Sequence, residues 1–340
     1  SDWLSFGKWG THIKRSSKSP DSHLAKISTD EFIIKGSYTD TASKIQIRAL
    51  LHTENTNVTP SIRQFIISYK DNTPRLKSIE IPSNKIIDVP SYSQYIRDKN
   101  IGGVICSPTS ITMLLNRRNE NLIVEETAWS CFDYDYEAFG NWLFNVAFAS
   151  SLGYESFVEY GHLKSLKREI YSEYPVAVSV KYTNDINNLE YPYIENALIT
   201  TAGHILVVRG FEKKDGIDYV VVNDPAGKSN ESVTRRYKLS EFESAWHRGS
   251  NIMYIIHDKE VEINNNRIEA SLELKNNKEN LYSVLVNDTY LDLSSDFVKT
   301  ILITYDNGLT FEYLVPYNNH YLALENKNKC VIYIIGSDGF

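Results

Sequence analysis

The stretch NIGGVICSPTSITMLL (residues 100–115) contains Cys106, one of only three cysteines in a chain of 340 residues. Ser107 and Pro108 favour a helix start here, because serine can cap free backbone N–H groups and proline is tolerated at the first helical position. Apolar residues then fall on one face of the predicted helix: Ile111, Leu114 and Leu115. A thiol at a helix N-terminus feels the positive end of the helix dipole, which lowers its pKa and favours the nucleophilic thiolate.

Cys106 also has a simpler interpretation, because free cysteines are usually small buried hydrophobic residues. Its position at a helix start does not by itself decide between this interpretation and a nucleophile. Gly102 and Gly103 precede it, and we expect them to let the backbone approach a bound substrate closely. The decision therefore depends on whether the chain also supplies a base.

A predicted hairpin supplies a candidate base and its orienting partner. His204 opens the apolar run HILVVRGF, Asp224 ends the run DYVVVNDP, and the turn sequence EKKDG lies between these runs. If the hairpin folds about Lys214, His204 and Asp224 face each other, to within a residue or two of register. A thiolate nucleophile needs a base, and the base needs a group that fixes its tautomer. The three residues together predict a Cys-His-Asp site.

Each of these residues has a structural interpretation when taken alone. His204 could be a hydrogen-bonded core histidine, and Asp224 could be a turn residue, since Asp-Pro is common in loops. Their joint occurrence downstream of a cysteine at a helix start favours catalysis. His162, His247 and His257 have no comparable partner in their local sequence, and we assign them no role.

The composition excludes several classes of function. Hydrophobic residues make up 42% of the chain and charged residues 23%, as in ordinary soluble domains. The net charge is −7 without a Lys/Arg cluster, which argues against a nucleic-acid partner. No apolar segment approaches the roughly 20 residues that span a bilayer. Three cysteines without a C-x-x-C argue against a disulfide framework and a structural zinc site, so we expect Cys106, Cys131 and Cys330 to be free.

The sequence predicts three parts. Residues 1–84 contain strand-like runs (31–38, 43–53 and 61–70) and predict an all-β, sandwich-like module. Residues 85–258 place helical candidates (107–118, 136–153 and 162–172) before strands (175–182, 204–211, 218–225 and 252–257), with a short helix at 239–246, which is an α+β pattern. Residues 259–340 predict a second all-β module, in which Asn307-Gly308 suits a type I′ hairpin turn.

The middle part resembles a known family. IDVPSYSQYIRDKNIGGVICSPTSITMLL (87–115), AGHILVVRGF (202–211) and YVVVNDPA (219–226) look like the bacterial papain-clan cysteine peptidases related to double-glycine-leader processing, family thirty-nine among them. Their pattern is Val-Pro, a Gln, Cys-Gly-Pro at a helix start, a Gly-His strand and Asn-Asp-Pro. The resemblance covers about 85–258 and implies a papain-like core, with a helical half and an antiparallel sheet, between the two β modules.

The resemblance also implies roles for four residues. Cys106 would be the nucleophile, His204 the base and then the acid, and Asp224 the orienting group. Gln94 matches the family's glutamine, whose amide would form an oxyanion hole with the backbone N–H of Cys106. The chain departs from the family where Ser107 replaces the usual glycine, and this side chain could narrow the site or cap the helix.

We therefore expect a cysteine peptidase or amide hydrolase that acts on a peptide or related amide through a thioester, without a metal or organic cofactor. Two alternatives remain. The same triad could transfer the acyl group to an amine or thiol, or an inert papain-like core could serve a cell-surface protein whose β modules bind glycans or partners. The flanking β modules and the habits of the family favour a secreted or cell-surface protein.

Overall fold

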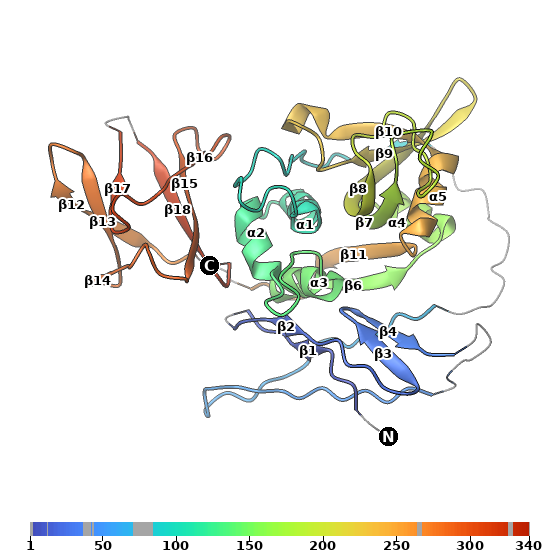
Figure 1. The fold of residues 1–340 in the computed structure, drawn as a ribbon, viewed down its shortest axis with the longest axis horizontal. Coiled ribbons are helices and arrows are strands. Elements are labelled where there is room, and N and C mark those ends of the chain that lie inside the picture. The colour runs from blue at the N-terminus through green and yellow to red at the C-terminus, as the bar shows by residue number, and fades with distance from the viewer. Residues whose placement is uncertain are drawn as a thin grey trace.

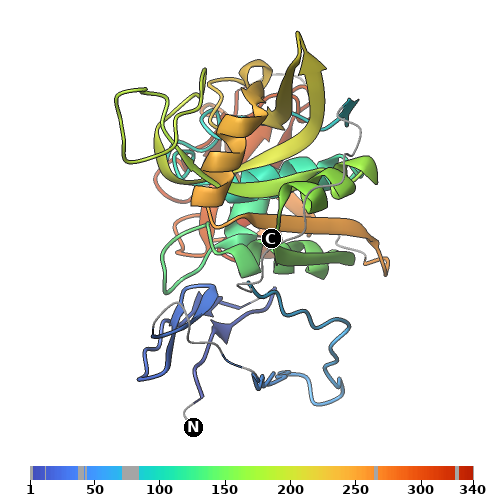
Figure 2. The same cartoon turned by 90° about the vertical axis from the view of Figure 1, so that its right-hand side faces the viewer.

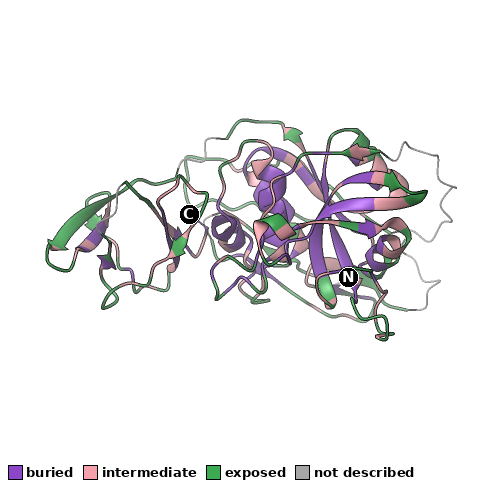
Figure 3. Cartoon of the chain, turned by 90° about the horizontal axis from the view of Figure 1, so that it is seen from above, coloured by how far each residue is buried: buried purple, intermediate pink, exposed green. Residues whose placement is uncertain are grey.

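The computed structural model describes residues 3–11, 13–36, 42, 44–70, 84–263, 267–325 and 329–339. A helix–sheet domain occupies the middle of the molecule, with a C-terminal β module on one side and the N-terminal segment along another (Figures 1 and 2). Buried residues concentrate in the helix–sheet domain, whereas the outer strands of the C-terminal module are largely exposed (Figure 3). No helix in the described ranges is long and apolar enough to cross a membrane.

The central sheet has seven strands in the order β10-β9-β8-β7-β11-β6, with β5 pairing to β8. Its strands are β5 (Lys85–Ile86), β6 (Tyr154–Tyr160), β7 (Val176–Tyr182), β8 (Thr201–Lys214), β9 (Ile217–Asn223), β10 (Thr234–Lys238) and β11 (Ile252–Lys259). Every pairing in this sheet is antiparallel. Strands β6 and β10 were not predicted from the sequence.

Helices cover both faces of this sheet, with α1–α3 on one side and α4 and α5 on the other (Figure 1). They are α1 (Cys106–Asn116), α2 (Val124–Cys131), α3 (Trp142–Ser151), α4 (Leu163–Tyr171) and α5 (Leu239–Arg248), with a 3-10 turn at Asn230–Ser232. Because both faces are covered, β7 is buried along nearly its whole length, and its first three residues, Val176–Val178, are a continuous apolar run. The predicted α+β class is confirmed; helix α2 was missed.

The hairpin β8–β9 carries a bulge. Its turn has positive φ angles at Asp215 (51°) and Gly216 (78°), as a type I′ turn requires. The register shifts between Val208 and Gly210, where Arg209 is the extra residue. The backbone carbonyl of Arg209 accepts from Ile87 N (2.8 Å) and its Nε donates to Ile87 O (2.8 Å). The bulge is therefore held by the segment that follows β5.

The N-terminal segment differs from the predicted sandwich. Its strands are β1 (Gly7–Lys8), β2 (Ser16–Ser17), β3 (Ala25–Ser28) and β4 (Glu31–Ile34), which form two two-stranded sheets. Residues 44–70 contain no strand, although the first predicted run there alternates; Ser43 and 37–38 lie outside the described residues. Alternation alone does not make a strand, because a strand also needs a partner for its backbone groups. The predicted strands over 44–53 and 61–70 are therefore wrong.

The C-terminal module is all-β, as predicted. One sheet contains β12 (Ala270–Asn276), β13 (Leu281–Val286), β14 (Thr289–Tyr290) and β17 (Leu322–Ala323), and the other contains β15 (Val298–Thr304), β16 (Glu312–Tyr313) and β18 (Val331–Gly336). Asn307 and Gly308 have positive φ angles (59° and 89°) in the β15–β16 hairpin. The loop is longer than a two-residue turn, because β15 ends at Thr304 and β16 begins at Glu312. Within it, Asp306 Oδ1 accepts from Thr310 N (2.9 Å). The boundaries at 84/85 and 258/259 stay predictions.

Candidate active site

Cys106 is the first residue of α1, as the sequence predicted. The capping role of Ser107 is wrong, because Ile105 occupies the N-cap position and no side chain caps the helix. Ser107 is buried instead, and its Oγ lies 2.9 Å from the Tyr254 hydroxyl on β11. The side chain at this departure from glycine is therefore engaged with Tyr254 rather than with the helix N-terminus.

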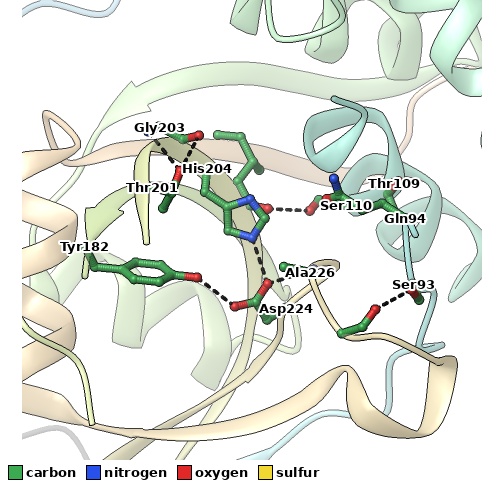
Figure 4. A network of polar contacts seen from close by, with 12 residues as sticks. Ser93, Gln94, Thr109, Ser110, Tyr182, Thr201, Gly203, His204, Asp224 and Ala226 are labelled. Atoms are coloured by element: carbon green, nitrogen blue, oxygen red, sulfur yellow. Dashed lines mark hydrogen bonds and ion pairs between the residues drawn. The ribbon is translucent and has the colours of Figure 1, made fainter. Parts of the chain in front are cut away.

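Helix α1 is fixed against β8 one turn after Cys106. Ser110 Oγ donates to the carbonyl of Ile205 (3.3 Å), the residue that follows His204 (Figure 4). This contact holds the start of α1, and with it Cys106, against the strand that carries His204. Burial opposes ionisation of the thiol, but the charge of His204, its hydrogen bond and the backbone N–H groups nearby lower the pKa of Cys106.

His204 and Asp224 meet across the hairpin. His204 Nε2 lies 2.7 Å from Asp224 Oδ1, and both side chains are buried. Val207 pairs with Asn223, so the register differs by two residues from a direct His204–Asp224 pairing. The contact still forms because Asp224 lies just beyond the end of β9, where its side chain can reach back along β8 (Figure 4).

The carboxylate of Asp224 is held by three further donors. Its Oδ1 also accepts from Ala226 N (2.9 Å), and its Oδ2 accepts from the hydroxyls of Tyr182 (3.0 Å) and Tyr237 (2.9 Å). Burial would raise the pKa of Asp224, but His204 and these donors lower it. Asp224 is therefore an ionised acceptor, and the hydrogen in its contact with His204 belongs to Nε2.

The charge on the imidazole follows from the same contacts. Burial lowers the pKa of His204, but the charges of Asp224 and Cys106 and hydrogen bonds to both raise it to about 10. Nε2 is occupied by Asp224, so Nδ1 is the nitrogen that faces the thiol. The lowered pKa of the thiol and the raised pKa of the imidazole both favour a thiolate and imidazolium pair.

Gln94 is 3% exposed and lies between the two halves of the site. Its backbone N–H donates to Pro225 O (2.9 Å), beside Asp224, and its Nε2 donates to Gly102 O (3.0 Å), four residues before Cys106. The second hydrogen of Nε2 is not used by this bond. Gln94 thus ties the turn that carries Asp224 to the segment that ends in Cys106.

The glycines before Cys106 differ from the expectation. A Cβ at Gly102 would lie 2.8 Å from Gln94 O and 3.1 Å from Asp98 O, so this glycine permits tight packing of its own loop rather than substrate approach. A Cβ at Gly103, or at Gly203 beside His204, would meet nothing within 4 Å. Gly103 and Gly203 therefore leave open space on the two sides of the candidate triad.

The sequence missed Tyr182 and Tyr237, because nothing local distinguishes them among 23 tyrosines. It also missed the partners of His257, which contacts Glu155 and Glu169. His162 accepts from Ser165 N through Nδ1 and caps α4.

All three cysteines are free, as predicted, and burial raises the pKa of Cys131 to about 12. The described residues contain no group of three or more His, Cys, Asp or Glu side chains that could hold a metal ion.

The part of the chain that carries this geometry matches a known protein family. Residues 86–253, just under half of the chain, match the sequence model of the Peptidase_C39 like family. The match includes Gln94, Cys106, His204 and Asp224 within its span. Together with the helices packed on an antiparallel sheet, it confirms the expected papain-like class of fold. Comparison with curated protein sequences gave no match.

Several solved structures are similar to about half of this chain. A double glycine motif protease from an AMS/PCAT transporter, solved with its leader peptide, is 18% identical over 51% of this chain and 93% of its own, with a TM-score of 0.33. A putative C39-like peptidase from Bacillus anthracis is 17% identical over 52% and 100%, with a TM-score of 0.39. Procathepsin L 3 from the Tenebrio molitor larval midgut is 13% identical over 51% and 67%, with a TM-score of 0.36. Similarity at this level says nothing about individual site residues.

Proposed function

Residues 86–253 belong to the Peptidase_C39 like family of cysteine peptidases, and from this premise we propose that Cys106, His204 and Asp224 are the catalytic triad of a peptide-bond hydrolase. The observation that carries the proposal is the buried contact between His204 Nε2 and Asp224 Oδ1 (2.7 Å), on a hairpin to which the Ser110–Ile205 hydrogen bond fixes α1, the helix that begins at Cys106. This arrangement supplies a nucleophile, a proton carrier and an orienting group.

The first half of the reaction forms a thioester. The Cys106 thiolate attacks the carbonyl carbon of the scissile bond, a C–S bond forms, and the carbonyl oxygen takes the negative charge. His204 Nδ1–H then donates its proton to the leaving amine as the C–N bond breaks. Asp224 keeps the imidazole oriented, because four hydrogen bonds hold its carboxylate in one position.

The oxyanion needs donors during this step, and two are available. The backbone N–H of Cys106 is one of the first four of α1, which have no partner within the helix. The second is the free hydrogen on Gln94 Nε2. We assign these two donors to the oxyanion hole, because the contacts of Gln94 with Pro225 and Gly102 hold it beside both ends of the site.

The second half releases the product. The neutral His204 accepts a proton from a water molecule, the resulting hydroxide attacks the thioester carbonyl, and the C–S bond breaks to give a carboxylic acid and the Cys106 thiolate. Every group that moves a proton in the cycle belongs to this chain. Transfer to an amine instead of water would differ only in this second half.

The test uses Cys106→Ser and Cys106→Ala with a mixture of peptides as substrate and mass spectrometry of the products. We expect wild-type cleavage, with loss of about 10³-fold or more in both variants, because removal of a nucleophile eliminates covalent catalysis. Full cleavage by Cys106→Ser would contradict the mechanism. Adding a primary amine distinguishes the alternative, since amide products in place of acids would indicate acyl transfer.

A further inference from the structure

The C-terminal β module packs against the part of the peptidase domain that leads into Cys106. Apolar residues from both sides form one cluster: Ile123, Leu302 and Ile335, with Trp129, Phe311, Tyr313 and Tyr333 around them. Strand β18 lies beside helix α2 in Figure 1. We call residues 94–105 the oxyanion loop, because they begin at Gln94 and end at the N-terminus of α1. The module contacts this loop as well as α2.

The contact between module and loop is a buried hydrogen bond. Thr300 on β15 donates its hydroxyl to Asp98 Oδ2 (2.8 Å), and the two residues are 4% and 7% exposed. Asp98 Oδ1 accepts from Asn100 N (2.9 Å), which turns the loop around this carboxylate. Asp98 is thus a buried charged group whose hydrogen-bond donors come from its own loop and from the C-terminal module.

A second side chain of the module, Tyr313, holds Asp98 indirectly through Glu125. Tyr313 on β16 donates to Glu125 Oε1 (2.5 Å), and this same oxygen accepts the backbone N–H of Asp98 (3.1 Å). Glu125 is fully buried in the first turn of α2. Both the side chain and the backbone of Asp98 are therefore held by groups that the module contacts.

The loop transmits this restraint to Gln94. The carbonyl of Asp98 accepts from Gly102 N (2.7 Å), and the carbonyl of Gly102 accepts from Gln94 Nε2 (3.0 Å). The relay from Thr300 to Gln94 thus consists of three successive hydrogen bonds. The tight packing at Gly102, where a Cβ would lie 2.8 Å from Gln94 O, means that a shift of Asp98 moves Gln94 as well.

We propose that the C-terminal β module is part of the catalytic machinery, with Thr300 as a positioning residue that holds the oxyanion loop, and through it Gln94, in the productive conformation. The proposal rests on the proposed function of the site. Thr300 touches neither the substrate nor the triad, so it affects stabilisation of the oxyanion without affecting formation of the thiolate.

Two reagents separate these effects without knowledge of the natural substrate. Iodoacetamide alkylates the Cys106 thiolate by displacement at a saturated carbon, so no oxyanion forms. With p-nitrophenyl acetate the thiolate attacks the acetyl carbonyl, an oxyanion forms, and the C–O bond breaks to release p-nitrophenolate and leave an acetyl thioester. The ratio of the two rate constants reports the oxyanion hole alone.

The variants are Thr300→Val, which keeps the shape and removes the hydroxyl, Thr300→Ser, which keeps the hydroxyl, and Tyr313→Phe. Tyr134→Phe is the matched control, because Tyr134 donates to Ser337 O (2.6 Å) at the same interface but does not contact the oxyanion loop. All are made in the full chain, and thermal unfolding is measured for each.

We expect Thr300→Val to lower the acylation rate about tenfold, since complete loss of an oxyanion donor costs about 10²–10³, with alkylation of Cys106 within twofold of wild type. Tyr313→Phe should lower the ratio of acylation to alkylation as well. Thr300→Ser and Tyr134→Phe should both keep the wild-type ratio.

An unchanged ratio in both Thr300→Val and Tyr313→Phe would overturn this inference alone. Equal losses in both reactions, or a ratio that falls as far in Tyr134→Phe, would mean that the module only stabilises the fold. A wild-type protein whose Cys106 reacts with neither reagent would overturn the proposed function and this inference with it.

Discussion

The region around His204 and the region around His257 each pair a histidine with a carboxylate, but the second neighbour of the ring differs. His204 contacts one carboxylate through Nε2 and a thiol through its other nitrogen. His257, on β11, has Nδ1 2.9 Å from Glu155 Oε2 and Nε2 2.9 Å from Glu169 Oε2. Carboxylate contacts raise the pKa in both cases. The difference is that His257 has no nitrogen left to exchange a proton with a third group.

This difference separates the histidine proposed as catalytic from one that joins elements of the fold. A carboxylate at each nitrogen of His257 favours the imidazolium form and raises its pKa, and the ring joins β6, α4 and β11. The ring of Tyr174 packs on it, with centroids 4.5 Å apart. A raised pKa therefore does not identify a functional histidine; the free ring nitrogen and its neighbour do.

The largest expected effect comes from removing one histidine at a time and measuring alkylation of each cysteine at pH 6. In His204→Ala the rate at Cys106 should fall about 100-fold, because a thiol with a free pKa of about 8.5 is almost fully protonated at this pH. In His257→Ala it should stay within twofold. Peptide mass spectrometry measures the rates, and the exposed Cys330 is the internal standard. An equal loss of the alkylation rate at Cys106 in both variants would mean that His204 acts on the thiol no more directly than His257 does.

A smaller effect is expected at the tyrosines that orient Asp224. Tyr182→Phe and Tyr237→Phe each remove one donor to Oδ2, which raises the pKa of Asp224 and lowers that of His204. We expect each variant to reduce alkylation of Cys106 at pH 6 by about threefold to tenfold, since one hydrogen bond to a charged group is worth about 1.5 kcal/mol or more. Tyr174→Phe, beside His257, is the matched control and should have no effect on Cys106.

The pH dependence of stability distinguishes the two partners within the candidate triad. The pKa of His204 is raised from 6.5 to about 10, so its contribution to stability is complete below about pH 6.5 and is lost as the pH rises toward 10. The pKa of Asp224 is lowered, so its contribution is present above about pH 4 and is lost as the pH falls through its folded-state value. Urea unfolding of wild type and His204→Gln from pH 4 to 10 measures this. A difference that grows between pH 7 and 10 would contradict the raised pKa.

The smallest effect is expected for His257→Gln. The side chains of His257 and its two glutamates are 17–35% exposed, so solvent weakens the interaction and we expect a loss of about 1–2 kcal/mol in unfolding free energy. Because the pKa of His257 is raised, the loss should be larger at pH 5.5 than at pH 9. A loss that is the same at both pH values would mean that packing against Tyr174, rather than charge, accounts for it.

The sequence predicted the parts of the site that have local signals and missed the parts that lack them. Cys106 follows from the helix start, and His204 and Asp224 from two apolar runs around a turn. Tyr182 and Tyr237 are ordinary strand residues until the sheet brings them to Asp224. The contact of Thr300 with Asp98 joins residues 202 positions apart, so no local pattern could reveal it.

The errors in the fold have a related cause. The run SKIQIRALLHT alternates like a strand, yet Ile45 and Ile47 are exposed and unpaired with another strand in the part of the chain that the structure describes. Helix α2 was missed because VEETAWSC is short and half polar, and its burial comes from packing against α1, α3 and strand β18 of the C-terminal module. In both places the outcome depends on a distant segment rather than on the local pattern.

The bulge at Arg209 determines on which face of β8 the side chain of His204 emerges. Side chains alternate between the faces of a strand, so one residue more or fewer reverses the face on which every later side chain emerges. Between the β8–β9 turn and His204 the chain contains one such extra residue. Without it, the imidazole would emerge from the opposite side of β8 relative to Asp224. Deleting Arg209 would thus separate His204 from Asp224 although all three residues of the candidate triad are still present, because the strand would be one residue shorter between the turn and His204.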